Sequence, residues 1–281
     1  MSKNRETEGL SREGIFDSHA HYFDRRFAAE TEGADAILVS EVFGKGVAGV
    51  INVGTNNENN RICIEQAARY PQMYAAVGLH PEDVQFCVGD LDEELASLRA
   101  LLDTEEKRQK NKIVALGEIG LDYHMEHTDK VRQAAFFEAQ LTLAEELDVP
   151  VIIHDREAHG DCFETVLRHP HVRGVFHSFS GSVEMARELV RRGWYISFSG
   201  VLTFKNARKT LEVAASLPHD RILVETDAPY LAPVPFRGRI NHSGLIAHTA
   251  AALADLIGLS YEETVALTAD NARALFGIKK S

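Results

Sequence analysis

Cysteine is scarce in this sequence, and the cysteines that are present lie far apart. Cys63, Cys87 and Cys162 are the only three in 281 residues, and no two of them form a Cys-x-x-Cys pair. Disulfide-stapled secreted domains and zinc knuckles require paired or closely spaced cysteines. The sequence therefore excludes both kinds of scaffold, and we interpret the three cysteines as reduced structural thiols.

Long apolar runs are also missing. The segment from Met1 to Gly14 is polar and charged, without the apolar stretch of a signal peptide. No later run approaches the roughly 20 apolar residues that a membrane-spanning helix needs. We therefore expect a cytoplasmic protein.

Positive charge is in deficit. The chain has 30 Lys and Arg against 42 Asp and Glu, which gives a formal net charge of −12. This balance excludes a protein that coats nucleic acid through a broad basic surface, so any phosphate binding must be local. Low-complexity segments and solenoid repeats are absent as well, which predicts a polar tail over residues 1–13 and a single catalytic domain over 14–281.

What the sequence does contain is a series of short, apolar, β-branched runs with room for a helix between neighbours. This is the pattern of parallel strands joined by crossover helices. Eight such units predict an α/β protein with the (β/α)8 TIM-barrel fold. The eight runs are Gly14–His19, Val47–Gly54, Met73–Leu79, Lys112–Gly117, Pro150–His154, Gly174–His177, Trp194–Ser199 and Arg221–Glu225.

Amphipathic segments fall between the runs, as the outer helices of a barrel require. Over Val131–Leu147, Phe137, Leu141 and Ala144 share one face. The last helix should begin after Ser260, an N-cap residue followed three positions later by Glu263. Further helices are expected within Cys87–Gln109, Glu184–Arg191, Asn206–Ser216, Gly244–Ile257 and Tyr261–Phe276.

Histidine gathers at the ends of the runs. In a parallel barrel the carboxyl ends of all strands meet on one face, where barrel enzymes place their active sites. His19 and His21 project to the same side because strand side chains alternate with period two, so both can bind one metal. The pair His169 and His171 has the same spacing, but it precedes the sixth run, so we interpret it as a solvated loop on the opposite rim.

Other runs end on further metal-ligating types. Glu118 lies between glycines, and a carboxylate at a barrel mouth can bridge two cations through its two oxygens. His154 and His177 end the fifth and sixth runs and form a second imidazole pair, which suits zinc, manganese or similar ions. Asp227 follows the eighth run and can both hold a metal and accept a proton.

A pair of dications would also suit phosphate chemistry. Together with Glu118 and Asp227, two dications leave a local charge of about +2. Such a site can bind a phosphodiester despite the acidic surface, and paired cations stabilise the attacking and leaving oxygens.

These motifs resemble those of the TatD-type family of metal-dependent deoxyribonucleases, within the wider barrel metallohydrolases. The resemblance covers nearly the whole chain. It rests on Asp17-Ser-His-Ala-His21, Val77-Gly-Leu-His-Pro81, Gly117-Glu-Ile-Gly-Leu-Asp-Tyr123, Pro150-Val-Ile-Ile-His154, His177-Ser-Phe-Ser-Gly181 and Glu225-Thr-Asp-Ala-Pro-Tyr-Leu-Ala-Pro233.

The resemblance implies two sites for divalent ions, zinc, manganese or magnesium, that share Glu118. One ion would be held by His19, His21, Glu118 and Asp227, and the other by Glu118, His154 and His177. It also implies a nuclease that commonly trims DNA from the 3′ end. The chain departs from the family at Asn241-His242-Ser243, where Asn-Glu-Pro is usual, and at Ser178, where Cys is frequent. Both departures bear on substrate choice.

We predict two-metal hydrolysis in which Asp227 takes the proton of the attacking water. Three residues are candidates for substrate contact, each with an ordinary alternative. His80 donates to phosphate or the leaving group, or is a structural hydrogen-bonding group; Arg156 and Arg237 bind phosphate, or are solvated.

Aromatic residues and one further carboxylate are also candidates. Asp17 has the strand parity of His19 and either orients that ring or hydrogen-bonds inside the barrel. The rim aromatics either stack on unpaired bases or pack. They are Tyr123, Phe179, Phe204, Tyr230 and Phe236.

Single-stranded DNA is the expected substrate partner, and two rival functions remain open. Barrel metallohydrolases use nearly the same ligands for acyl substrates, so an ester, lactone or amide hydrolase is one rival, with an acyl-tRNA deacylase as a narrower form. The other is a noncatalytic binding protein that retains the metals as a scaffold.

Overall fold

Eight parallel strands form one sheet, in the order in which they occur along the chain. The structure is a computed structural model that describes residues 9–85 and 89–280. The strands are β1 (Phe16–Ala20), β2 (Gly49–Val53), β3 (Met73–Val77), β4 (Ile113–Asp122), β5 (Val151–Arg156), β6 (Gly174–Phe176), β7 (Tyr195–Phe198) and β8 (Ile222–Val224).

The sheet closes on itself between its first and last strands. Ala20 and Ala228 form a parallel bridge, and the backbone N–H of Asp227 donates to the carbonyl oxygen of His19 at 2.9 Å. The hydroxyl of Ser18 donates to the carbonyl oxygen of Val224 at 3.0 Å. These contacts confirm the predicted (β/α)8 barrel.

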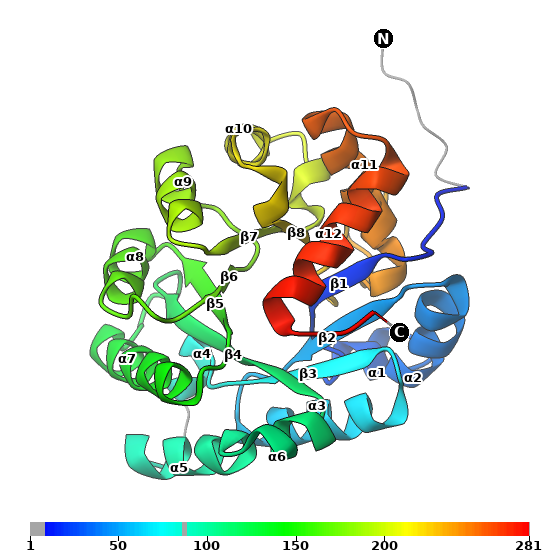
Figure 1. Ribbon diagram of the computed structural model, residues 1–281. Helices are drawn as coiled ribbons and strands as arrows, with labels where there is room; N and C mark the ends of the chain where they lie inside the picture. The colour runs from blue at the N-terminus through cyan, green and yellow to red at the C-terminus, as the bar shows by residue number, and fades with distance from the viewer. Residues whose placement is uncertain (1–8, 86–88, 281) are drawn as a thin grey trace.

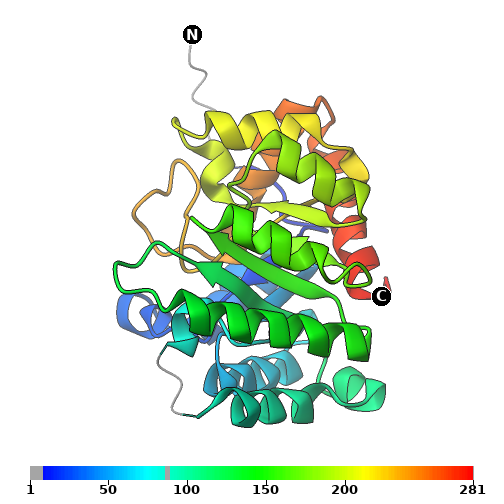
Figure 2. The ribbon, with the colours of Figure 1, turned by 90° about the vertical axis from the view of Figure 1, so that its left-hand side faces the viewer.

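Helices surround the strands (Figure 1). In Figure 2 the helices from green to yellow lie one above another on the outside in chain order, and the long loops after β4 and β8 project from the same end of the barrel. The helices are α1 (Arg26–Glu30), α2 (Ala34–Ile37), α3 (Asn57–Arg69), α4 (Pro81–Val84), α5 (Leu91–Leu102), α6 (Glu105–Lys110), α7 (Lys130–Leu147), α8 (His159–Leu167), α9 (Val183–Arg191), α10 (Arg208–Ser216), α11 (Ile246–Ile257) and α12 (Tyr261–Phe276).

Two apolar clusters hold this arrangement together. One fills the space between the strands and the outer helices. The other joins barrel residues such as Ile51, Ala115 and Leu223 to Leu275 and Phe276 of α12. Because strand side chains alternate, one set of apolar residues packs outward and the other fills the barrel, which α12 covers.

Some boundaries differ from the predicted ones. The strand β4 continues to Asp122, five residues past the predicted end, because it pairs with β5 as far as Arg156. Two helices, α5 and α6, occupy the segment for which one was expected, since the side chain of Thr104 caps a new helix there. Cys87, at the start of that predicted segment, lies outside the described residues. The capping box of Ser260 and Glu263 is confirmed.

Within residues 9–85 and 89–280, no single helix has the length and apolar character to cross a bilayer. The helices α11 and α12, with the turn that precedes α11, would reach that length together, but they are bent by 106° relative to each other.

Candidate metal centre

A cleft of about 780 Å³ opens at the carboxyl ends of the strands. Five of the six predicted metal ligands line it: His21, Glu118, His154, His177 and Asp227. The sixth, His19, is fully buried beneath them. The structure therefore brings together side chains that come from five different strands or the loops that follow them.

His19 and His21 direct the same ring nitrogen to one point. Their Nε2 atoms lie 3.0 Å apart, as the period-two argument predicts for a residue of β1 and the second residue after it. Nδ1 of His21 lies 2.7 Å from the carbonyl oxygen of Val53. Donation to that carbonyl leaves Nε2 of His21 free to bind a metal.

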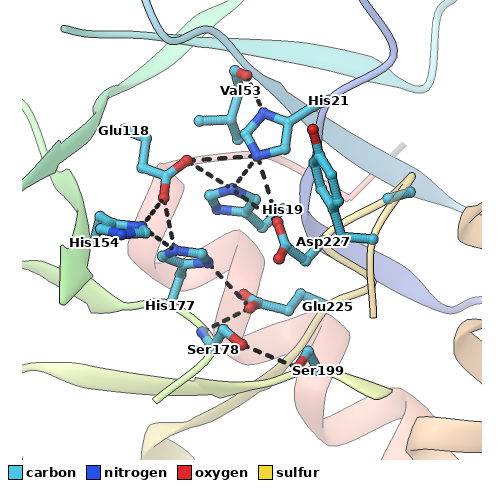
Figure 3. A network of polar contacts seen from close by, with 12 residues as sticks. His19, His21, Val53, Glu118, His154, His177, Ser178, Ser199, Glu225 and Asp227 are labelled. Atoms are coloured by element: carbon cyan, nitrogen blue, oxygen red, sulfur yellow. Dashed lines mark hydrogen bonds and ion pairs between the residues drawn. The ribbon is translucent and has the colours of Figure 1, made fainter. Parts of the chain in front are cut away.

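Glu118 lies between two groups of imidazoles (Figure 3). Its Oε2 is 3.3 Å from Nε2 of His19 and 3.5 Å from Nε2 of His21. Its Oε1 is 2.6 Å from Nδ1 of His154 and 2.7 Å from Nε2 of His177. Each carboxylate oxygen therefore faces its own pair of histidines.

The ionisation of Glu118 follows from these neighbours. Burial raises the pKa of this carboxyl, but the surrounding imidazoles, above all His177, His80 and His19, outweigh burial and hold the pKa well below its usual range. Glu118 is therefore a carboxylate, the form that a bridging metal ligand requires.

The glycines beside Glu118 serve close packing. A Cβ atom at Gly120, whose φ is +147°, would collide with the carbonyl oxygen of His154. A Cβ atom at Gly117 would lie 2.7 Å from that of Ile152. Both positions exclude larger residues because β4 runs so close to β5 beside Glu118.

Asp227 lies on the other side of the first histidine pair. Its Oδ1 is 3.4 Å from Nε2 of His21 and 3.8 Å from Nε2 of His19. Its φ of +58° is in the left-handed region, which aspartate tolerates better than most residues. Burial raises the pKa of Asp227, but its hydrogen bond with His21 and the charges of the imidazoles lower the pKa by more, so the pKa lies below its usual value.

Two carboxylates that the sequence reasoning missed support the second histidine pair. Oδ2 of Asp122 lies 2.8 Å from Nε2 of His154, and Oε1 of Glu225 lies 3.3 Å from Nδ1 of His177. Metal-binding histidines usually have such a partner on the ring nitrogen that faces away from the metal. The sequence contained evidence for both carboxylates. Asp122 is separated from Glu118, and Glu225 from Asp227, by an even number of positions, so in an extended strand each pair of side chains points to the same side.

The two additional carboxylates correct the predicted charge of about +2. That prediction counted only Glu118 and Asp227. With Asp122 and Glu225 included, two dications would be balanced by the four carboxylates around them. The attraction for phosphate must then come from the direct contact with the ions.

The chemistry of the donor set fits metal ions. Three groups of ligand atoms each lie within 4.8 Å of one another: His19 with His21 and Glu118, His80 with Glu118 and His154, and His19 with His177 and Glu225. Nδ1 of His19 and Oε2 of Glu225 are buried without a hydrogen-bond partner. Imidazole nitrogens held around a carboxylate are the ligands that zinc and similar ions prefer.

The predicted substrate contacts occupy different places. Nδ1 of His80 accepts from the backbone N–H of Glu82 at the start of α4, and its Nε2 lies 3.5 Å from Oε1 of Glu118, so this histidine is both a helix cap and a group facing the site. Arg156 is exposed and lines the cleft. Arg237 lies outside the lining, with its guanidinium 3.6 Å from the ring centre of Phe204.

Among the rim aromatics, Tyr230 and Phe179 line the cleft. Tyr230 is 43% exposed, whereas Phe179 is buried. Asp17 accepts hydrogen bonds from the hydroxyl and the backbone N–H of Thr226. Of the two roles considered for Asp17, the structure therefore shows hydrogen bonding inside the barrel. The ring of His19 donates no hydrogen bond to Asp17.

Two further predictions concern the pair His169 and His171 and the segment Asn241-His242-Ser243. His169 is buried against Glu138 and Glu145, so the solvated-loop interpretation is wrong for it, although His171 is exposed. At the first departure from the family pattern, Asn241 donates to the carbonyl oxygens of Thr226 and Tyr230, and His242 lies outside the cleft lining.

The chain is similar to known proteins over nearly its whole length. The family described as TatD related DNase matches residues 16–277. The uncharacterized metal-dependent hydrolase YabD of Bacillus subtilis (strain 168) is 36% identical over 267 residues, which cover 94% of this chain and 99% of that protein. The crystal structure of YjjV, a TatD homologue from Escherichia coli K12, superposes with a TM-score of 0.85 at 31% identity and covers 96% of this chain and 100% of that one.

More distant structures share the barrel. A phosphotriesterase homology protein from Escherichia coli, complexed with phosphate in its active site, gives a TM-score of 0.66 at 15% identity, covering 94% of this chain and 98% of that one. At that identity the likeness shows the fold alone.

Proposed function

The chain belongs to the TatD-related DNase family of metal-dependent hydrolases, and we propose on that premise that it removes nucleotides from the 3′ end of single-stranded DNA with two divalent metal ions. The observation that carries this proposal is the division of four imidazoles between the two oxygens of Glu118. A carboxylate in that position is suited to bridge two cations, and paired cations suit phosphodiester hydrolysis.

His19, His21, Glu118 and Asp227 would hold one ion, and Glu118, His154 and His177 the other. Bound there, the ions would supply charge neutralisation at the nonbridging phosphate oxygens and a lowered pKa for water. Asp122 hydrogen-bonds the far ring nitrogen of His154, and Glu225 lies at ion-pair distance from the far ring nitrogen of His177.

The remaining steps fall to side chains at the mouth of the cleft. Asp227 is ionised, and its side chain is 15% exposed, so it can accept a proton from the attacking water. Arg156 can donate to a nonbridging oxygen, and Nε2 of His80 is placed to donate to phosphate or the leaving group.

The test is metal-dependent digestion of end-labelled single strands and matched duplexes at equal salt. We expect chelator-treated protein to be inactive, activity to return with zinc, manganese or magnesium, and single strands to be degraded faster from the 3′ end. Glu118→Ala should abolish cleavage. Glu138→Gln, which alters a carboxylate beside His169 on the opposite rim, should not.

A panel of esters, lactones, amides and an acyl-tRNA, run beside the oligonucleotides, tests the acyl rival. Faster turnover of any of these substrates would reject the nuclease proposal. Absence of hydrolysis on both panels by protein that binds metal would favour a binding scaffold.

A further inference from the structure

Two roles compete for His80 beside the metal centre. Its Nε2 lies 3.5 Å from Oε1 of Glu118, and a ring nitrogen of His80, a carboxylate oxygen of Glu118 and a ring nitrogen of His154 all lie within 4.8 Å of one another. A nitrogen in that position could hold a metal ion, or it could donate a hydrogen bond to a substrate oxygen. One nitrogen cannot do both, because the first role needs an unprotonated Nε2 and the second a protonated one.

The other ring nitrogen decides between these roles. Nδ1 of His80 accepts a hydrogen bond from the backbone N–H of Glu82 at 3.1 Å, as the N-cap of α4. A backbone N–H can only donate, so Nδ1 carries no proton. In a neutral imidazole the proton then lies on Nε2, the atom that faces Glu118.

The backbone around His80 holds the ring in this orientation. The N–H of His80 donates to the carbonyl oxygen of Thr55 at 2.8 Å, and its carbonyl oxygen accepts from the N–H of Val84 at 3.0 Å. Pro81 follows with a restricted φ and no N–H, so the N–H of Glu82 is the first in α4 that needs an acceptor. Only 11% of the His80 side chain is exposed. His80 therefore presents one N–H to the cleft in a single direction.

A second proton on the ring would cost His80 this cap. An imidazolium has two N–H groups and no acceptor, so it would place a proton on Nδ1 against the N–H of Glu82. The ring that keeps the cap is neutral. A neutral imidazole polarises an oxygen by hydrogen bonding, but it is a poor source of a proton for a departing alkoxide.

We infer that His80 is a catalytic residue of one defined kind, a neutral donor that stabilises a nonbridging phosphoryl oxygen through its Nε2–H, and is neither a metal ligand nor the acid for the leaving group. The capping hydrogen bond from Glu82 is the positioning contact that sets this form of the ring. This inference rests on the proposed function, because the phosphoryl group is that of the proposed substrate.

The proton balance of the step follows. The oxygen of water forms a bond to phosphorus, the bond from phosphorus to the 3′-oxygen breaks, and Asp227 takes the proton of the attacking water. The departing 3′-oxygen takes its proton from solvent. His80 keeps its proton throughout.

Two esters of thymidine 5′-phosphate that differ only in the leaving group test this assignment. One is the p-nitrophenyl ester, whose departing phenolate needs no proton. The other is the dinucleotide of two thymidines, whose departing 3′-oxygen does. A residue that stabilises the phosphoryl oxygen acts on both substrates alike, whereas a leaving-group acid acts on the dinucleotide alone.

The variant His80→Asn suits this comparison, because asparagine is also a good N-cap but has no donor that reaches the position of Nε2. We expect kcat/KM to fall about 10- to 100-fold, the effect of losing one hydrogen bond to a charged oxygen, and by the same factor within about threefold on both substrates. Bound metal, measured by elemental analysis, should be unchanged. His171→Asn, at an exposed histidine outside the cleft lining, should match the wild type.

Nitrogen NMR reads the state of the ring without turnover. In magnesium-loaded protein labelled with nitrogen-15 in histidine, the ring whose signals disappear in His80→Asn should have an unprotonated Nδ1 and a protonated Nε2. A loss of activity confined to the dinucleotide, loss of bound metal in His80→Asn, equal rates for variant and wild type, or a protonated Nδ1 would each overturn the inference. Absence of cleavage of both esters by metal-loaded wild type would instead reject the proposed function.

Discussion

The carboxylate of Glu225 lies 3.3 Å from Nδ1 of His177, on the side of the ring opposite to the nitrogen that faces Glu118. Glu225 is fully buried, and the same oxygen accepts from the backbone N–H of Ser178 at 2.7 Å. The ring of His177 thus lies between two carboxylates, one of which is available to share a metal, and its Nδ1 makes no hydrogen bond to Glu225.

This relationship predicts that Glu225→Gln weakens binding of the metal that His177 holds by about 10- to 100-fold, because the amide cannot orient and polarise the ring as a carboxylate does. Competition with a chelator of known affinity measures the effect at each site. Glu138→Gln, at the carboxylate beside His169, provides the control. An unchanged affinity in the Glu225 variant would contradict a positioning role.

The bridging assignment predicts different losses for two ligands. Glu118→Ala should reduce binding at both metal sites, whereas His177→Ala should chiefly weaken one, because only Glu118 faces both histidine pairs. Metal titration followed by elemental analysis distinguishes these results, with about two ions per chain expected for the unaltered protein. Loss of a single ion in both variants would reject the bridge.

Arg156 and Arg237 form a matched pair of arginines at the rim. Arg156→Ala should lower kcat/KM on single-stranded DNA by about 10- to 100-fold, the effect of losing one charged hydrogen bond, without loss of metal. Arg237→Ala should have a much smaller effect, because its guanidinium stacks on Phe204 outside the cleft lining. Metal release from the Arg156 variant would show that the residue acts on the centre itself.

The burial of His242 should make the free energy of unfolding depend on pH. Burial lowers the pKa of His242 to about 4, and its Nδ1 has no hydrogen-bond partner. The unfolded chain, in which the pKa returns to about 6.5, binds the proton more readily. His242 therefore favours the folded state above about pH 6.5, and this contribution is lost as the pH falls toward 4.

Two variants measure this effect. Between pH 7 and pH 4.5, His242→Gln should lose about 2–3 kcal/mol less unfolding free energy than the wild type. Denaturant unfolding in the presence of chelator gives both values. His171→Gln, at an exposed histidine, should follow the wild type. Parallel pH profiles for His242→Gln and the wild type would exclude the buried histidine as the cause.

The sequence allowed much of this architecture to be predicted, because strand periodicity and barrel geometry act locally. His19, His154 and His177 each end an apolar run and His21 lies two residues beyond the first, and parallel strands bring such ends together whatever the loops between them. Asp227 is located by the same rule, three residues beyond the end of its strand.

The missed features depend on contacts between elements. The predicted fourth run ends at Gly117, which leaves Asp122 outside the strand, whereas Gly117 and Gly120 permit β4 to approach β5 and continue as a strand. The burial of His169 arises from Glu138 and Glu145 on α7, a long-range contact that no local pattern reports.

The closure of β1 against the end of β8 has a consequence for the growing chain. Asp227 reaches His19 only across that junction, so the two residues meet after more than two hundred intervening positions have been synthesised and the barrel has closed. A chain that ends just before Ile222 contains all the ligand histidines and Glu118, yet it has neither β8 nor Asp227. Contacts this distant in sequence form late and slow folding. The complete ligand set of the metal centre therefore forms only once β8 and the loop that follows it have joined β1.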